Sequence, residues 1–440
     1  MAKWNIYTPE GFRDVLFDEC YSKRNIENKI RNIFRKRGFL EIETPALEFY
    51  DAFSPESGLI EQETMFKFFD EQGRILVMRP DATIPVARVA ATKFADKDMP
   101  LRVSYLCNTF RYNELGGGKL KEFTAAGVEI IGEGNPEADA EVIATAIKTI
   151  ISIGIDSFQI DLGQMQFFKG IMEDSGLSEQ ETEQIRVLID RKDFIGVEEI
   201  VKARGLDENL RTLILGLSGF YGSIDVIDKL RTLTNNKRAL IALDNLESVY
   251  NILKDYGYEK YISLDLGMLQ NPNFYTGIIF KGFTYDVGFP ILRGGRYDGL
   301  VAKFGKELPA TGFSMGVNML MTALERQNEE LEKPRIDTIV GYEESGCVSK
   351  PSPRQEAIAI CEELRRQGLN AQLDIVCKDR AGIENYAKNE GIDGYLYVKE
   401  AGVIEVCNLK TGEVEELNKA ELLGEEAELS DNSRNKEGGQ

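Results

Sequence analysis

The 440-residue chain is predicted to be an α+β protein, built on an antiparallel sheet flanked by helices, with a helical insertion and a small C-terminal α/β domain. Three observations predict this class. Short β-rich runs lie between amphipathic helical patterns in the first part of the chain, and residues from about 175 to 256 have helical patterning almost throughout. After Pro334, strand and helix patterns alternate.

The first predicted helix runs from Ser22 to Arg37, where apolar residues recur every three or four positions. A second runs from Ala138 to Ile153 and has Gly154 in the place of a helix C-cap. Between the two helices, the β-rich runs 74–78 and 128–131 predict strands of an antiparallel sheet.

Strand patterns return at Tyr261, after the helical region 175–256. Residues 278–280 and 284–287 are predicted to pair as a hairpin around Lys281-Gly282-Phe283, because a glycine between two apolar runs is typical of a turn.

A domain boundary is predicted near residues 328–334, where an acidic helical end meets a proline. Residues 1–330 then form one domain and residues 334–416 a small α/β domain. Residues 421–440 lack apolar periodicity and are expected to be disordered. The small domain is predicted to contain strands at 336–340, 372–376 and 394–398 and helices at 354–367 and near 383–391.

The chain carries 53 basic and 73 acidic residues, a formal charge of −20. Nucleic acids are bound mainly by clustered Lys and Arg, so a soluble acidic protein is favoured over a tRNA binder. The chain begins without an apolar signal segment, and no run is apolar enough to span a membrane. We therefore expect a cytoplasmic protein with no nucleic-acid or membrane partner.

The sequence contains no histidine, which excludes imidazole as a general base or metal ligand. Its six cysteines include no C-x-x-C pair, so no ordinary zinc spacing can be assembled. We expect reduced thiols, no metal and no cofactor.

Seven short motifs stand in an order and spacing that resembles the histidyl-tRNA synthetases, a class II aminoacyl-tRNA synthetase family. The resemblance covers roughly residues 5–330 and implies the class II fold, with the helical insertion at about 175–256 and a reduced anticodon-binding domain at the C-terminus. It also implies a dimer interface near Pro45. The motifs lie at residues 9–14, 37–45, 79–83, 110–112, 119–123, 127–129 and 269–277 with 294–300.

Four departures from the synthetase pattern decide the expected activity. Gln270 stands where that family has its catalytic arginine, and Met319 where it has the motif 3 arginine that contacts ATP. Asn113 replaces the glutamate that reads adenine, and Lys119 replaces a second arginine. The loss of a single side chain that stabilises charge developing in the transition state typically lowers the rate about a hundredfold to a thousandfold. With these replacements, the resemblance implies a protein without catalytic residues.

A second resemblance is closer. Residues 275–300 and 79–88 resemble the regulatory subunits of ATP phosphoribosyltransferase. This implies a non-catalytic protein that joins a short-form catalytic ATP phosphoribosyltransferase subunit, as a homodimer within a hetero-oligomer. That complex carries out the first step of histidine biosynthesis, with L-histidine as feedback effector.

The resemblance also implies a histidine-binding pocket. Ala125 and Arg293 beside it differ from the glutamine and the small residue of the synthetases. The residues expected to bind histidine are Asp81 and Thr83 at the amino group, Arg111 near the carboxylate, Glu129 toward the imidazole, and Tyr275 and Tyr297 as walls.

Three alternatives remain open on the sequence alone. An active histidyl-tRNA synthetase would show histidine-dependent ATP–pyrophosphate exchange, and a paralogue that adenylates another amino acid would show exchange with amino-acid pools. A tRNA-binding sensor would shift total tRNA on a gel at low salt.

Overall fold

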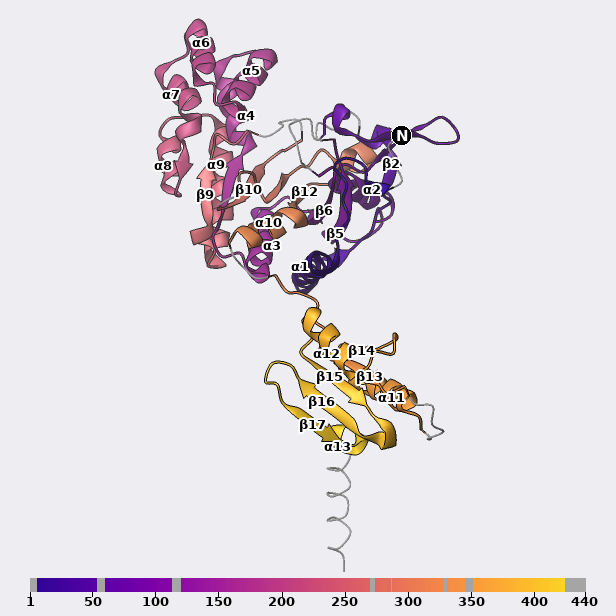
Figure 1. The fold of residues 1–440 in the computed structure, drawn as a ribbon. Helices are drawn as coiled ribbons and strands as arrows, with labels where there is room; N and C mark the ends of the chain where they lie inside the picture. Colours follow the sequence, from indigo (N-terminus) through magenta and orange to yellow (C-terminus); the bar gives the residue numbers. More distant parts are fainter. Residues whose placement is uncertain are drawn as a thin grey trace, which may run out of the picture. The chain divides into compact units, whose positions relative to one another are not determined.

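The computed structural model describes residues 6–53, 60–112, 120–269, 274–285, 287–327, 331–344 and 351–423. They form two compact units, a larger one that extends to Glu332 and a smaller one that begins at Lys333 (Figure 1). None of the helices in these ranges has the length and apolar character that crossing a membrane requires.

A nine-stranded sheet organises the larger unit and confirms the α+β prediction. The sheet is antiparallel from β5 to β7, while β1 pairs with β5 and β9 with β7 in parallel. In spatial order its strands are β1 Leu40–Glu41, β5 Leu101–Phe110, β6 Glu122–Ile131, β12 Ala310–Gly316, β11 Leu292–Arg296, β10 Ile278–Thr284, β7 Phe158–Gln164, β9 Ile262–Asp265 and β8 Tyr221–Gly222. A second, antiparallel sheet holds β2 Leu47–Phe49, β4 Ile75–Met78 and β3 Lys67–Phe69.

Ten α-helices are described in the larger unit. In α3, the Asn135 side chain accepts a hydrogen bond from the Ala138 N–H, and Gly154 takes the left-handed conformation at the end (φ 103°). Helices α5 to α8 group together beside α4 and α9 (Figure 1). The helices are α1 Phe17–Lys36, α2 Thr83–Thr92, α3 Pro136–Ile153, α4 Met165–Ser175, α5 Glu179–Asp190, α6 Phe194–Arg204, α7 Glu208–Gly216, α8 Asp225–Arg231, α9 Lys237–Asp255 and α10 Val317–Arg326.

Short 3-10 helices connect several of these elements. The described ones span Tyr50–Phe53, Gln62–Thr64, Leu217–Gly219, Glu259–Tyr261, Val301–Phe304 and, in the smaller unit, Glu400–Gly402.

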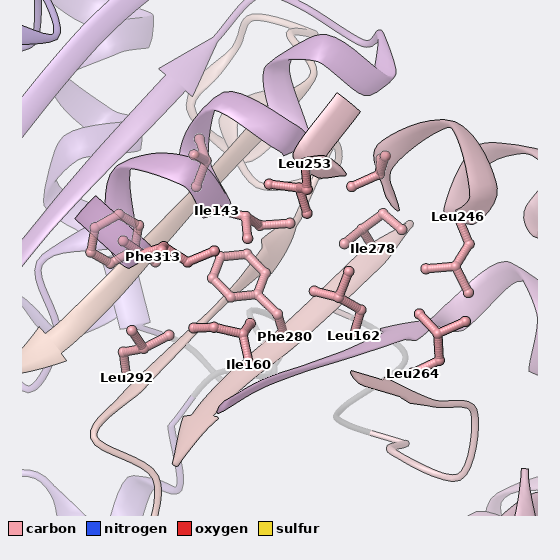
Figure 2. Packing of buried hydrophobic residues seen from close by; sticks show 14 of the residues in the cluster. Ile143, Ile160, Leu162, Leu246, Leu253, Leu264, Ile278, Phe280, Leu292 and Phe313 are labelled. Carbon is pink, nitrogen blue, oxygen red and sulfur yellow. The ribbon is translucent and has the colours of Figure 1, made fainter. Parts of the chain in front are cut away.

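One face of the nine-stranded sheet is the hydrophobic core (Figure 2). Phe313 of β12 and Phe280 of β10 flank Gly294 of β11 in register, and helices α1, α3, α9 and α10 cover this face. A Cβ on Gly294 would lie 2.3 Å from the Phe280 ring and 2.7 Å from Phe313. The glycine therefore makes room for both side chains over β11. The opposite face carries a second hydrophobic cluster together with buried polar residues such as Glu129.

The hairpin predicted around Lys281-Gly282-Phe283 is wrong. These residues continue β10, which pairs with β7 along its length and with β11 on its other edge. A Cβ on Gly282 would lie 2.7 Å from Leu292 and 3.3 Å from Ile160, so close packing inside the sheet, rather than a turn, requires the glycine.

The smaller unit is a five-stranded sheet in the order β14-β13-β15-β16-β17, with β14, β13 and β15 parallel. Helix α11 packs against Val340 and Leu396, and α12 against Ile339 and Tyr395, so both faces are covered. The elements are β13 Thr338–Tyr342, α11 Pro353–Arg366, β14 Ala371–Leu373, α12 Arg380–Asn389, β15 Gly394–Val398, β16 Ile404–Asn408, β17 Val414–Leu417 and α13 Lys419–Leu423.

Strands β16 and β17 have no counterpart in the sequence prediction, because glutamates interrupt their apolar pattern. Glu405 of β16 is nevertheless buried, and its carboxylate accepts a hydrogen bond from the Tyr395 hydroxyl (2.9 Å) and pairs with Arg380 and Lys399. Helix α13 includes residues 421–423, where the disordered tail was expected to begin, and residues 424–440 lie outside the described part.

Candidate functional site

The six residues expected to bind histidine meet on the face of the nine-stranded sheet opposite the core. Elements far apart in sequence supply them, and hydrogen bonds, an ion pair and ring contacts connect them. Asp81 and Thr83 stand at the start of α2, Arg111 follows β5, Glu129 lies in β6, Tyr275 precedes β10 and Tyr297 follows β11.

Glu129 is the centre of this group and is 1% exposed. Its Oε1 accepts a hydrogen bond from Thr83 Oγ1 at 3.0 Å, and its Oε2 accepts one from the Tyr297 hydroxyl at 2.5 Å. Gly312 of β12 stands opposite it in register. A Cβ on Gly312 would lie 1.5 Å from Glu129 Oε2, so this glycine makes the space that the carboxyl group occupies.

Burial raises the pKa of Glu129 to about 8, although the hydrogen bonds from Tyr297 and Thr83 oppose the shift. At neutral pH the buried Glu129 side chain is therefore mostly a carboxylic acid. Burial also raises the pKa of Tyr297 and of Tyr275, so both hydroxyls stay protonated.

Asp81 and Arg111 lie at the other end of the group. Asp81 Oδ1 accepts a hydrogen bond from the Thr83 N–H at 2.7 Å at the start of α2, and its Oδ2 lies 3.6 Å from Arg111 Nη2. Arg111 Nε also donates to the Pro80 carbonyl at 2.6 Å. Behind them, the buried Arg79 donates to the carbonyl of Asn108 at 2.8 Å and fixes this segment to the end of β5.

The wall is aromatic. The rings of Phe274 and Tyr297 stack with centroids 5.2 Å apart, and Tyr275 meets Phe274 edge-on at 4.7 Å. A Cβ on Gly295 would lie 2.8 Å from the Tyr275 ring, so Tyr275 can cover the sheet only because residue 295 is glycine.

A buried ion pair anchors the strand that ends at Tyr297. Arg296 Nη2 lies 3.0 Å from Asp139 Oδ1 in α3, and its Nη1 lies 3.2 Å from Asp298. Asp298 in turn accepts a hydrogen bond from the Thr276 hydroxyl at 2.9 Å. The hydrogen bond between Thr276 and Asp298 thus links the segment that carries Tyr275 to the segment that carries Tyr297.

Sequence reasoning missed Tyr105 and Phe274 as members of this site. Burial raises the pKa of Tyr105, and its hydroxyl lies where a Cβ of Gly127 would be, at 2.4 Å. Its pairing with a glycine across β5 and β6 becomes visible only once the strand register is known. Phe274 lies within a motif that the sequence analysis used, but its apolar side chain gave no signal of a role.

Three of the positions that depart from the synthetases lie within the described residues. Ala125 is buried in β6, Arg293 is exposed on β11, and Met319 is 38% exposed on α10. Gln270, Asn113 and Lys119 lie outside the described residues.

The arrangement suits a small zwitterion with a polar ring. A carboxylate and a guanidinium mark one end, and a carboxyl group with two hydroxyls marks the other. In the described ranges, no three cysteine, aspartate or glutamate side chains are grouped to hold a metal ion.

Comparison with known proteins agrees with this fold. The family model for histidyl-tRNA synthetase matches residues 11–320. An ATP phosphoribosyltransferase regulatory subunit from Acetivibrio thermocellus is 58% identical over 423 residues, covering 96% of this chain and 100% of the relative. One from Ruminiclostridium cellulolyticum is 48% identical over 96% of this chain and 99% of its own.

Solved structures give the same result. A Bacillus halodurans protein, described as an ATP phosphoribosyltransferase regulatory subunit/histidyl-tRNA synthetase, aligns with a TM-score of 0.79 and 30% identity over 90% of this chain and 98% of its own. Histidyl-tRNA synthetase from a Nostoc species shares the fold, with a TM-score of 0.79 and 22% identity over 96% of this chain and 98% of its own. The chain therefore belongs to the family of ATP phosphoribosyltransferase regulatory subunits, which have the class II fold of the histidyl-tRNA synthetases.

Proposed function

We propose that this chain is the non-catalytic regulatory subunit of a cytoplasmic ATP phosphoribosyltransferase and that its pocket binds L-histidine. It joins a short-form catalytic subunit, is required for the first step of histidine biosynthesis and mediates feedback inhibition. The observation that carries the proposal is the buried Glu129, held by the Thr83 and Tyr297 hydroxyls, in a chain whose relatives carry the regulatory name.

The charges of the pocket match histidine. The amino group pairs with Asp81, the carboxylate with Arg111, and the imidazole reaches Glu129. Because the pKa of Glu129 is about 8 and that of a free imidazole about 6.5, the two groups together hold one proton near neutral pH. Histidine can therefore bind either as imidazolium against a carboxylate or as imidazole against the carboxylic acid, without net proton uptake.

Inhibition follows if histidine binds the inactive assembly more tightly than the active one. The chain then acts by shifting an equilibrium, and the chemistry takes place on the catalytic subunit.

Glu129→Gln is expected to weaken histidine binding about tenfold to hundredfold, because a charge-assisted hydrogen bond contributes roughly 1.5–3 kcal/mol. Inhibition should weaken in parallel, while the uninhibited activity of the complex is retained. Calorimetric titration of the chain and inhibition curves of the reconstituted complex measure the two effects. Tyr275→Ala should act similarly, although it also opens a cavity.

Glu199→Gln on the exposed surface of α6 is the matched control, since it removes the same charge outside the pocket. Wild-type affinity and normal inhibition in Glu129→Gln would remove Glu129 from the sensor.

The purified chain is expected neither to form histidyl-adenylate nor to charge or bind tRNA. Met319 offers a thioether where a cation on ATP is needed, and the chain is strongly acidic. ATP–pyrophosphate exchange with histidine measures the first activity, an active histidyl-tRNA synthetase being the positive control. Histidine-dependent exchange by the purified chain would contradict the proposed function.

The chain is also expected to form a homodimer through β1 and the region around Pro45. Leu40 on the edge strand β1 is 68% exposed and Pro45 is exposed, whereas Phe39 is buried in the chain's own core. Leu40→Glu should therefore shift the dimer toward monomer in light scattering. Ile195→Glu, at a position 74% exposed on α6, is the control; a monomeric wild-type chain would exclude the dimer.

A further inference from the structure

Three hydrogen-bond donors lie side by side on the pocket face of the nine-stranded sheet. Ser314 of β12 is directly opposite Arg293 of β11, and Arg293 is directly opposite Lys281 of β10. Each is two residues along its strand from the row that contains Gly312 and Gly295, so the three side chains share the face of Glu129. This row lies about 7 Å along the strands from the pocket row.

The two cations of this row make no close polar contact in the part of the chain that the structure describes. Neither Arg293 nor Lys281 forms a hydrogen bond, or an ion pair within 4.0 Å, there. Arg293 is exposed, whereas Lys281 is half-buried. Like charges directly opposite each other on paired strands destabilise a sheet, so an anion at Arg293 would relieve part of this cost. Asp161, opposite Lys281 on the other strand, relieves another part.

The electrostatic environment is consistent with unbalanced positive charge around Arg293. Burial lowers the pKa of Lys281, and the charge of Arg293 adds to the effect. The surrounding protein also lowers the pKa of Arg111, Asp81 opposes this shift, and the charge of Arg293 adds to it. The positive charge of Arg293 therefore contributes to the lowered pKa of two other cations, Lys281 and Arg111.

Acids lie on both sides of this row. Ser314 contacts Tyr105, on which the charges of Glu129 and Asp81 also act. Further acids lie beyond Lys281. Asp161 of β7 is opposite Lys281 in register, and burial together with the charge of Asp265 raises the pKa of Asp161 to about 6. These carboxylates and Asp190 attract Lys281 from the far side. Arg293 is thus the cation of this row that an anion would stabilise most, because Lys281 already faces carboxylates.

We propose that Ser314, Arg293 and Lys281 bind a phosphate or pyrophosphate group, either free or carried by a nucleotide. A guanidinium can bind phosphate oxygens with two parallel hydrogen bonds, while an ammonium and a hydroxyl add single donors. Since neighbouring strands lie about 4.8 Å apart, one phosphate reaches two of these side chains and a pyrophosphate reaches all three. The two cations stand at other positions than the three arginines of the synthetases that Lys119, Gln270 and Met319 replace in this chain.

The site goes beyond the proposed function. It adjoins the histidine-binding set, since the charge of Arg293 acts on Arg111 and Tyr275, but none of its three residues belongs to that set. Calorimetric titration of the full chain with inorganic phosphate, pyrophosphate and ATP, at low salt and without histidine or catalytic subunit, therefore tests it alone. We expect one site per chain and tighter binding of pyrophosphate than of phosphate.

Arg293→Gln should weaken pyrophosphate binding about tenfold to hundredfold, from the roughly 1.5–3 kcal/mol of a charge-assisted hydrogen bond. Lys281→Gln should weaken it as well, and Arg293→Lys should restore part of the affinity because it restores the charge. Arg211→Gln on α7, an equal loss of charge on the insertion, is the matched control and should leave binding unchanged. A melting temperature close to wild type verifies that each variant is folded.

Two results would overturn the proposal: no phosphate or pyrophosphate binding by the wild-type chain at millimolar concentration, or the same affinity in Arg293→Gln as in wild type. Binding lost equally in the Arg211 control would mean a non-specific charge effect and would overturn it too. If the variants support the site, the relative affinities identify its natural ligand. Tighter binding of ATP than of pyrophosphate indicates a nucleotide, and the reverse order indicates a free anion.

Discussion

Gly312→Ala is expected to destabilise the larger unit by about 3 kcal/mol or more and to abolish histidine binding. The new Cβ would lie 1.5 Å from Glu129 Oε2 and 2.5 Å from the Val128 carbonyl oxygen. Overpacking a well-packed interior typically costs about 1–3 kcal/mol, and here a backbone group and a buried carboxyl group must both move. Thermal unfolding by circular dichroism and calorimetric titration with histidine measure the two effects.

Gly219→Ala is the matched control, because a Cβ there would meet nothing within 4 Å. It should leave both stability and binding close to wild type. The double variant Gly312→Ala/Glu129→Ala separates the two contacts, since it removes the carboxyl overlap and keeps the backbone overlap. Wild-type stability of the single variant would show that Glu129 does not occupy the space over Gly312.

The second large effect is the contribution of Glu129 to the pH dependence of folding stability. Its pKa rises from an ordinary 4.5 to about 8 in the folded chain. Between these values the unfolded chain has released the proton and the folded chain keeps it. Stability from this group is therefore fully present below pH 4.5 and is lost as the pH rises through 8. Over the whole window the loss is at most about 5 kcal/mol.

Glu129→Gln removes this dependence, because an amide resembles the neutral acid and does not titrate. The variant should gain stability relative to wild type from pH 5 to pH 8.5, even though it binds histidine less tightly. Chemical denaturation of the larger unit at a series of pH values, without histidine, measures the difference. Glu199→Gln should follow the wild-type curve; a Glu129→Gln curve parallel to it would mean that Glu129 is ionised in the folded chain.

The sequence predicted those elements whose signals are local. The helix at 138–153 begins within two residues of the prediction, because an asparagine cap and a terminal glycine define its ends. The strand 394–398 is found as predicted. Gly282 misled the prediction because a glycine needed for packing and a glycine needed for a turn look alike in sequence, and only the neighbouring strand distinguishes them.

The site divides in a similar way. Motif positions identified the six pocket residues, although their role in binding histidine stays a proposal. The roles of Gly312, of Tyr105 and of the Arg296–Asp139 pair could not be predicted, because each depends on strand register or on a contact 157 residues apart in the chain. The row of Ser314, Arg293 and Lys281 likewise exists only after three strands have been aligned.

At Gly294 and Gly295, only the backbone of β11 lies between the hydrophobic core and the face of the sheet that carries Glu129. On one side Phe280 rests where a side chain of residue 294 would be, and on the other Tyr275 rests where a side chain of residue 295 would be. Nothing but main chain separates an aromatic ring that stabilises the fold from one that covers the proposed ligand pocket. We therefore expect a substitution that alters core packing at Phe280 to shift Tyr275 as well, so that the interior and the proposed binding surface constrain each other.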